Sequence, residues 1–105
     1  MDRTVGLRWF SFSNSWMDCL VLVNGAHKET AAKVIIDAMD AWSDDPDWND
    51  TCYGDCIDIF LNERGIPHVM DFCDADADVY PEREEQWERR LESYISVGIE
   101  ITQIH

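Results

Sequence analysis

The chain has 105 residues, of which 46% are hydrophobic and five are Trp, so it can form one domain with its own core and is too apolar for intrinsic disorder. Its 22 acidic residues outnumber its eight Lys and Arg, and the net charge of −14 excludes direct binding to nucleic acid or to an anionic membrane as its main activity. No stretch approaches the roughly 18 apolar residues of a membrane span, and we see no signal peptide. We therefore expect one soluble, cytoplasmic domain over residues 1–105.

The first two predicted elements are strands at residues 4–12 and 17–23. Both segments are rich in aliphatic and aromatic residues, and neither has a helical period. A short polar connection, Ser13-Asn14-Ser15, separates them. This arrangement favours an antiparallel hairpin.

Two helices are predicted next, at residues 28–42 and 53–61. In each, apolar residues recur three and four positions apart, which is typical of an amphipathic helix. The segment 43–51 between them contains Pro46 and has no period, so we expect a loop. After the second helix, Gly65 is placed for a left-handed C-cap, and Pro67 follows it.

The last part of the chain predicts a strand at 66–73, an acidic connection, a helix that starts at Pro81 and a final strand at 99–102. Pro81 suits a first helical position, and Glu82, Glu84 and Glu85 favour the positive end of the helix dipole. The predicted order is ββααβαβ. We expect an α+β fold in which three helices cover one face of a mainly antiparallel, four-stranded sheet.

Four cysteines raise the question of disulfides or a zinc site. Without a secretory signal, reduced thiols are the default. Cys52, Cys56, Cys73 and His68 could supply the four ligands of a zinc site, but Cys56 falls on the apolar face of the second helix. We expect no metal and no cofactor.

A calcium loop is a further alternative, because Asp74, Asp76 and Asp78 occupy positions 1, 3 and 5 of a segment with Glu85 at position 12. Position 6, which should be Gly, is Val79. The pattern therefore favours at most weak divalent-cation binding.

The negative charge is concentrated in residues 37–82, which contain 14 acidic residues and only one base, Arg64. On the first predicted helix, Asp37, Asp40 and Asp44 cluster opposite the apolar face; on the second helix, Asp55 and Asp58 do the same. No lysine is interspersed in this segment. Either the charge serves solubility alone, or the surface is shaped to meet a strongly basic partner.

Aromatic residues suggest two further contact regions. Trp9, Phe10 and Phe12 lie on one predicted strand at positions that cannot all face the same way. Either this strand is buried on both faces, or part of the set is exposed and forms a homodimer interface. In the acidic loop, Trp48 between Asp47 and Asn49 suits an interface anchor.

In size, acidity and lack of a catalytic motif, the chain resembles the small acidic DNA-mimic inhibitors of phages and mobile elements, of the anti-CRISPR and anti-restriction type. The resemblance implies a non-catalytic protein that occupies the basic nucleic-acid groove of a target enzyme. The residues predicted to contact this partner are Asp37, Asp40, Asp44, Asp45, Asp47, Trp48, Asp50, Asp55, Asp58, Asp74, Asp76 and Asp78. The alternative function is an accessory interaction domain that dimerises through Trp9, Phe10 and Phe12, with the acidity serving only solubility.

Overall fold

The computed structural model describes residues 3–12, 16–49, 53–75 and 78–104. The elements are β1 (Thr4–Phe12), β2 (Trp16–Asn24), the 3-10 helix η1 (Gly25–His27), α1 (Lys28–Asp44), α2 (Pro46–Asn49), α3 (Tyr53–Glu63), β3 (His68–Ala75), α4 (Tyr80–Ser96) and β4 (Glu100–Gln103). The α+β class, the four strands and the three long helices are as predicted. The short elements η1 and α2 make the order differ slightly from ββααβαβ.

The strands form one mixed sheet in the order β3-β2-β1-β4. β2 pairs antiparallel with β1 and β3, whereas β4 pairs parallel with β1, with Val5 opposite Glu100. The prediction of a mainly antiparallel sheet is therefore wrong. The reason is α4, which returns the chain along the sheet so that β4 runs in the same direction as β3; a helical crossover is the usual link between parallel strands.

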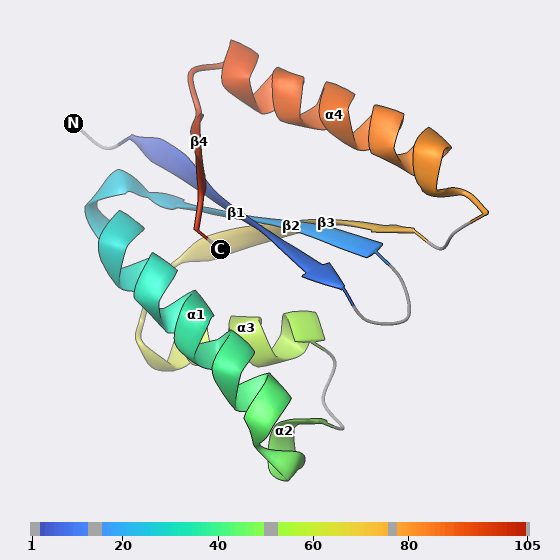
Figure 1. The fold of residues 1–105 in the computed structure, drawn as a ribbon. Helices are drawn as coiled ribbons and strands as arrows, with labels where there is room; N and C mark the ends of the chain where they lie inside the picture. The colour runs from blue at the N-terminus through green and yellow to red at the C-terminus, as the bar shows by residue number, and fades with distance from the viewer. Residues whose placement is uncertain (1–2, 13–15, 50–52, 76–77, 105) are drawn as a thin grey trace.

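The helices lie on both faces of the sheet, and the prediction that they cover one face is wrong. Figure 1 shows α1 and α3 on one side and α4 on the other. The cause lies in β2, where the unbroken apolar run Cys19–Val23 gives both faces of the strand residues that must be buried. The larger core lies between the sheet and the α1–α3 layer and includes Leu7, Trp9, Cys19, Val21, Ile35, Ala38, Cys56, Ile57 and Leu61.

A smaller core lies under α4. It consists of Leu20, Cys73, Trp87 and Leu91. Gly6 of β1 faces this side, and a Cβ atom added there would lie only 2.9 Å from Cδ1 of Leu20. The absence of a side chain at Gly6 thus leaves room for the side chains that α4 packs against.

The segment predicted as a loop at 43–51 contains the end of α1, which extends to Asp44, and the one-turn helix α2. The prediction is therefore wrong for residues 43, 44 and 46–49. The Oδ1 atom of Asp45 accepts a hydrogen bond from the backbone N–H of Asp47 (2.9 Å), as an N-cap does. Pro46 follows at the first helical position, where its missing N–H is not needed. Gly65, by contrast, has the predicted left-handed conformation (φ +68°) after α3.

Candidate functional site

The three aspartates of α1 lie on its outer side. Asp37, Asp40 and Asp44 are all exposed, whereas Ile35 and Ala38 are completely buried against the sheet. The helical period thus places these carboxylates in solvent, as predicted.

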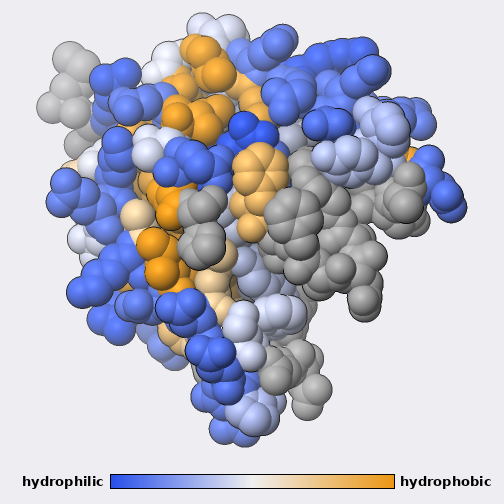
Figure 2. Space-filling model, viewed as in Figure 1, coloured by the Kyte–Doolittle hydropathy of each residue, from blue (hydrophilic) through white to orange (hydrophobic). Residues whose placement is uncertain are grey.

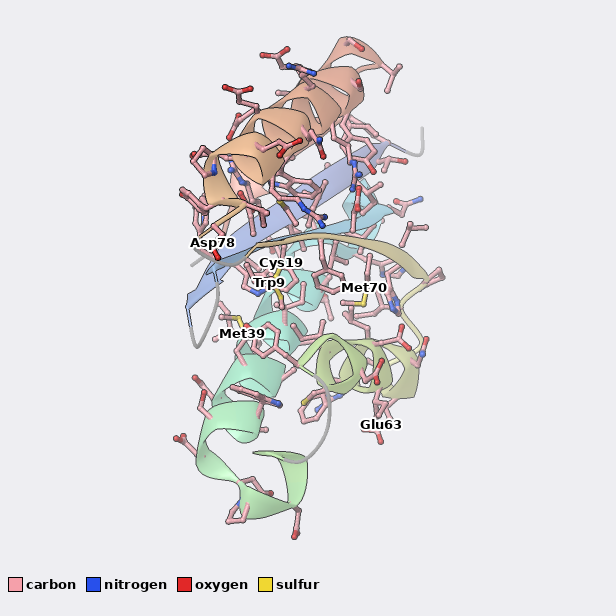
Figure 3. The ribbon with its side chains drawn as sticks, turned by 90° about the vertical axis from the view of Figure 1, so that its right-hand side faces the viewer. Trp9, Cys19, Met39, Glu63, Met70 and Asp78 are labelled. Atoms are coloured by element: carbon pink, nitrogen blue, oxygen red, sulfur yellow. The ribbon has the colours of Figure 1, made fainter. Side chains whose placement is uncertain are left out.

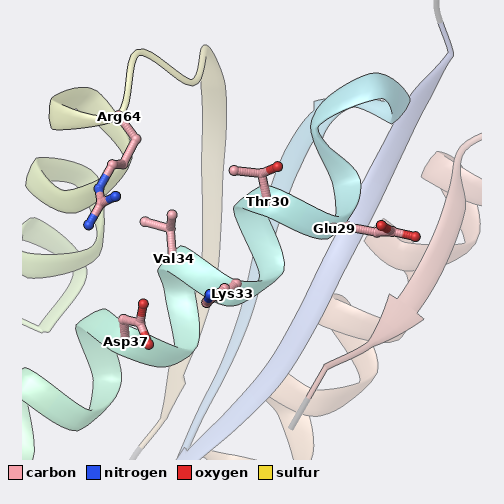
Figure 4. A pocket seen from close by; sticks show the side chains of 6 residues that line it. All are labelled: Glu29, Thr30, Lys33, Val34, Asp37 and Arg64. Carbon is pink, nitrogen blue, oxygen red and sulfur yellow. The ribbon is translucent and has the colours of Figure 1, made fainter.

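Asp37 does not lie in an unrelieved acidic stripe, because two cations lie beside it. Lys33 precedes it by one turn of α1, and Arg64 approaches from the end of α3 (Figure 4). Together with Glu29, Thr30 and Val34, these residues line an open depression of about 510 Å³. Lys33 and Arg64 therefore reduce the negative potential at Asp37, the first residue of the acidic segment 37–82.

Two further candidate carboxylates are engaged within the protein. Asp45 caps α2, and Asp58 is half-buried with its Oδ1 atom 2.5 Å from Nε2 of His68. The second oxygen of Asp58 accepts a hydrogen bond from Asn62 (3.3 Å). His68, only 4% exposed, donates through Nδ1 to the carbonyl of Ile66 (2.8 Å). Asp58 therefore ties α3 to the start of β3, and it is not the free surface charge that we predicted.

The remaining candidates do not form one surface. Asp47 of α2 and Asp55 of α3 are exposed, whereas Asp78 is exposed in the turn before α4 (Figure 3), the helix on the face of the sheet opposite α1. Asp50 and Asp76 fall outside the described residues, as do the side chains of Trp48 and Asp74.

Four exposed aspartates without a described internal partner remain on the helical layer: Asp40 and Asp44 near the C-terminal end of α1, Asp47 in α2 and Asp55 in the first turn of α3. We call the set of Asp40, Asp44, Asp47 and Asp55 the acidic end. Its helices pack together, since α1 contacts both α2 and α3. Figure 2 shows hydrophilic residues at the bottom of the view, where α1 ends and α2 lies in Figure 1.

The aromatic side chains beneath the acidic end fix its helices to the sheet. The ring of Trp42 in α1 meets that of Tyr53 in α3 edge to face, with centroids 5.1 Å apart. Nε1 of Trp9, in β1, donates a hydrogen bond to the hydroxyl of Tyr53 (3.0 Å). Because edge-to-face contacts and a buried hydrogen bond define the orientation of both rings, the carboxylates above them are held on a rigid scaffold.

The position of Trp9 also answers the question of the aromatic strand. Trp9 is completely buried, so the prediction that it contributes to a dimer interface is wrong. Phe10 is half-buried on the other face, where the guanidinium of Arg8 lies 4.8 Å from its ring centroid. The side chain of Phe12 is outside the described part of the chain.

Sequence reasoning missed an ion pair in the sheet. Asp18 of β2 is completely buried, and the Nε and Nη2 atoms of Arg8 bind its two carboxylate oxygens at 3.0 and 2.5 Å. Glu88 of α4 lies 3.6 Å from the same guanidinium. The hydrogen bond to Asp18 raises the pKa of Arg8 above its ordinary value, although burial acts in the opposite direction. An Asp within an otherwise apolar strand is the signal that could have indicated this pair.

The cysteines do not share a site. Cys56 belongs to the core under α1 and α3, and Cys73 to the core under α4, so they lie on opposite faces of the sheet and cannot bind one zinc ion. Among the described residues, no group of three or more metal-ligating side chains is suitably placed for a metal ion. The segment compared with a calcium loop instead ends in a helix, because α4 already begins at Tyr80.

Thiol accessibility provides a first test of this arrangement. The thiols of Cys19, Cys56 and Cys73 are buried and form no disulfide, and burial also raises the pKa of the Cys56 thiol. In a Cys52→Ser variant, we expect no rapid reaction with Ellman's reagent at about pH 8, close to the ordinary pKa of a thiol. Unfolding in guanidinium should then release all three remaining thiols. Rapid labelling of any of them in the native protein would contradict the packing described above.

None of the helices in the described ranges combines the length and the apolar composition needed to cross a membrane. Comparison with protein-family models, with curated proteins and with solved structures found no match to this chain.

Proposed function

We propose that this protein is a non-catalytic inhibitor whose acidic end occupies the basic nucleic-acid-binding surface of a target enzyme, in the manner of DNA-mimic anti-CRISPR and anti-restriction proteins. The observation that carries the proposal is the acidic end itself. Its four exposed aspartates lie on three packed helices, and residues 37–63 contain no Lys or Arg.

The electrostatics of such a surface suit a nucleic-acid-binding enzyme. Duplex DNA presents about one negative charge per 1.7 Å of its axis, and its binding grooves are lined with Lys and Arg. Carboxylates at i and i+4 of a helix, such as Asp40 and Asp44, lie about 6 Å apart along its axis. A groove that attracts phosphates also attracts these carboxylates, and the complementary fields accelerate association.

The rigid scaffold supports the same proposal. A partner that binds the acidic end does not need to order a loop, because Trp42, Tyr53 and Trp9 already fix the helices relative to the sheet. Less conformational entropy is lost on binding, so more of the electrostatic attraction appears as affinity. Asp37 contributes less than Asp40 or Asp44 to the attraction of a basic partner, because Lys33 and Arg64 lie beside it.

The test is affinity capture with competition. The protein is immobilised, a bacterial lysate is passed over it, and the retained proteins are eluted with duplex DNA or with salt at matched ionic strength. We expect basic nucleic-acid-binding enzymes to be released by DNA, and their binding to weaken steeply between about 0.05 and 0.5 M salt as the Debye length shortens. Retention that is indifferent to both DNA and salt would contradict the proposal. If a soluble, labelled copy of the protein added to the lysate is the main species retained, the accessory dimerising domain is favoured.

A further inference from the structure

A small cavity lies on the other side of the molecule, between the edge strand β3 and α4. Its volume is about 40 Å³, which suffices for one small ion or for a single carboxylate group, since a water molecule occupies about 30 Å³ in the liquid. The residues that line it are Phe72, Cys73, Arg83, Gln86, Trp87 and Arg90.

One wall of this cavity carries an unsatisfied donor. Trp87 is only 2% exposed, and within the described part of the chain its Nε1 atom is the one buried side-chain nitrogen or oxygen without a hydrogen-bond partner. Buried polar groups in folded proteins nearly always have a partner. The indole N–H of Trp87 therefore lacks an acceptor, and Trp87 is also one of the residues that line the cavity.

The other polar side chains around the cavity are chiefly donors. Within the described ranges, the guanidinium of Arg83 makes no ion pair or hydrogen bond. Arg90 uses Nη1 to bind Asp71 (2.7 Å), and its guanidinium lies 5.4 Å from the Trp87 ring centroid, which leaves other N–H groups for a ligand. The thiol of Cys73 already donates to the carbonyl of Arg83 (3.5 Å).

This donor set distinguishes an anion from a water molecule. A water molecule that accepts two hydrogen bonds also needs two acceptors for its own hydrogens. An anion, by contrast, only accepts hydrogen bonds and can do so from every donor around it. Arg83, Gln86 and Arg90 lie three and four positions apart, on one side of α4, next to Trp87. This region is also less acidic than the rest of the chain, because three arginines balance three glutamates within residues 83–90.

We propose that Arg83, Gln86, Trp87 and Arg90 form a binding site for a small monovalent anion, either chloride or the carboxylate group of a small acid. The site lies under α4, on the opposite face of the sheet from α1 and α3. It is thus independent of the proposed inhibitory function.

The test uses the indole N–H signals of the ¹⁵N-labelled protein. Sodium chloride and sodium formate are titrated separately, and sodium perchlorate, whose anion has no carboxylate and is a weak hydrogen-bond acceptor, keeps the ionic strength constant. We expect the Trp87 signal to shift and to saturate with chloride, with formate or with both, which also identifies the source of the anion. The Trp9 signal is the internal control, because its N–H already donates to Tyr53.

Two variants with the same change in charge complete the experiment. Arg83→Gln removes a cation from the wall of the cavity, and Arg89→Gln removes an exposed cation that does not line it. We expect Arg83→Gln to weaken the apparent affinity about tenfold or more, through loss of a charge-assisted hydrogen bond, and Arg89→Gln to leave it unchanged. The proposal is overturned if the Trp87 shift fails to saturate with either anion, or if the two variants behave alike. Both arginines are exposed, so neither substitution should prevent folding.

Discussion

Replacement of Arg8 by leucine is expected to lower the free energy of unfolding by about 3–5 kcal/mol, because it leaves a buried charge without a partner. Asp18 is completely buried, and both of its oxygens bind the Arg8 guanidinium. No other cation is paired with Asp18 in the described structure. Since domains of this size are stable by only about 5–15 kcal/mol, the variant should lose a large fraction of its stability.

Urea denaturation followed by Trp fluorescence and far-UV circular dichroism measures this effect. Arg89→Leu is the control, since Arg89 is exposed on α4 and its loss should change stability by no more than about 0.5 kcal/mol. In the double variant Arg8→Leu/Asp18→Leu the buried charge is absent, so we expect most of the lost stability to return. If Arg8→Leu unfolds at the same urea concentration as the control, the ion pair does not contribute as described.

Reversal of charge at the acidic end is expected to weaken binding to a captured basic enzyme by about a hundredfold or more, which corresponds to about 2.7 kcal/mol. The variant is Asp40→Lys/Asp44→Lys. Both residues are exposed near the C-terminal end of α1, where the helix dipole favours cations over carboxylates, so stability should be equal or slightly higher. Binding is measured by titration of the enzyme that DNA released from the immobilised protein.

The matched control is Glu85→Lys/Glu92→Lys on α4. It changes the net charge by the same amount, and its residues are equally exposed on the other side of the sheet. If net charge alone drives the interaction, both variants should lose the same affinity. Only a selective loss at Asp40 and Asp44 supports a defined binding surface, and unchanged binding by that variant would show that the partner contacts another part of the protein.

Local patterns predicted most of the elements. The bounds of β1 agree with the predicted strand at 4–12, and Gly65 ends α3 as expected, because both signals depend on residues that are neighbours in sequence. The direction of β4 and the second helical layer were not predicted. They depend on which face of the sheet α4 covers, and periodicity within α4 does not contain that information. The apolar run Cys19–Val23 was the available sign that both faces are buried.

In the candidate site, too, features set by sequence neighbours could be predicted, whereas features set by packing between elements could not. Helical periodicity placed Asp40, Asp44 and Asp55 in solvent, because exposure of a helix face follows from the position of its apolar residues. It did not reveal that Asp58 binds His68 or that Arg64 lies beside Asp37. Those neighbours come from other elements of the fold, so only the packing of α1, α3 and β3 determines them.

The parallel pairing of β1 with β4 has a consequence for the order in which the protein assembles. The first half of β1 pairs on one side with β2, its neighbour in sequence, and on the other side with β4, nearly a whole chain away. The entropic penalty for closing a loop rises with its length, and contacts between distant residues slow folding. The pairing of β1 with β2 thus closes the smallest loop in the sheet, and the pairing of β1 with β4 closes the largest. One short strand of four residues therefore completes a sheet whose other three strands can already be in place.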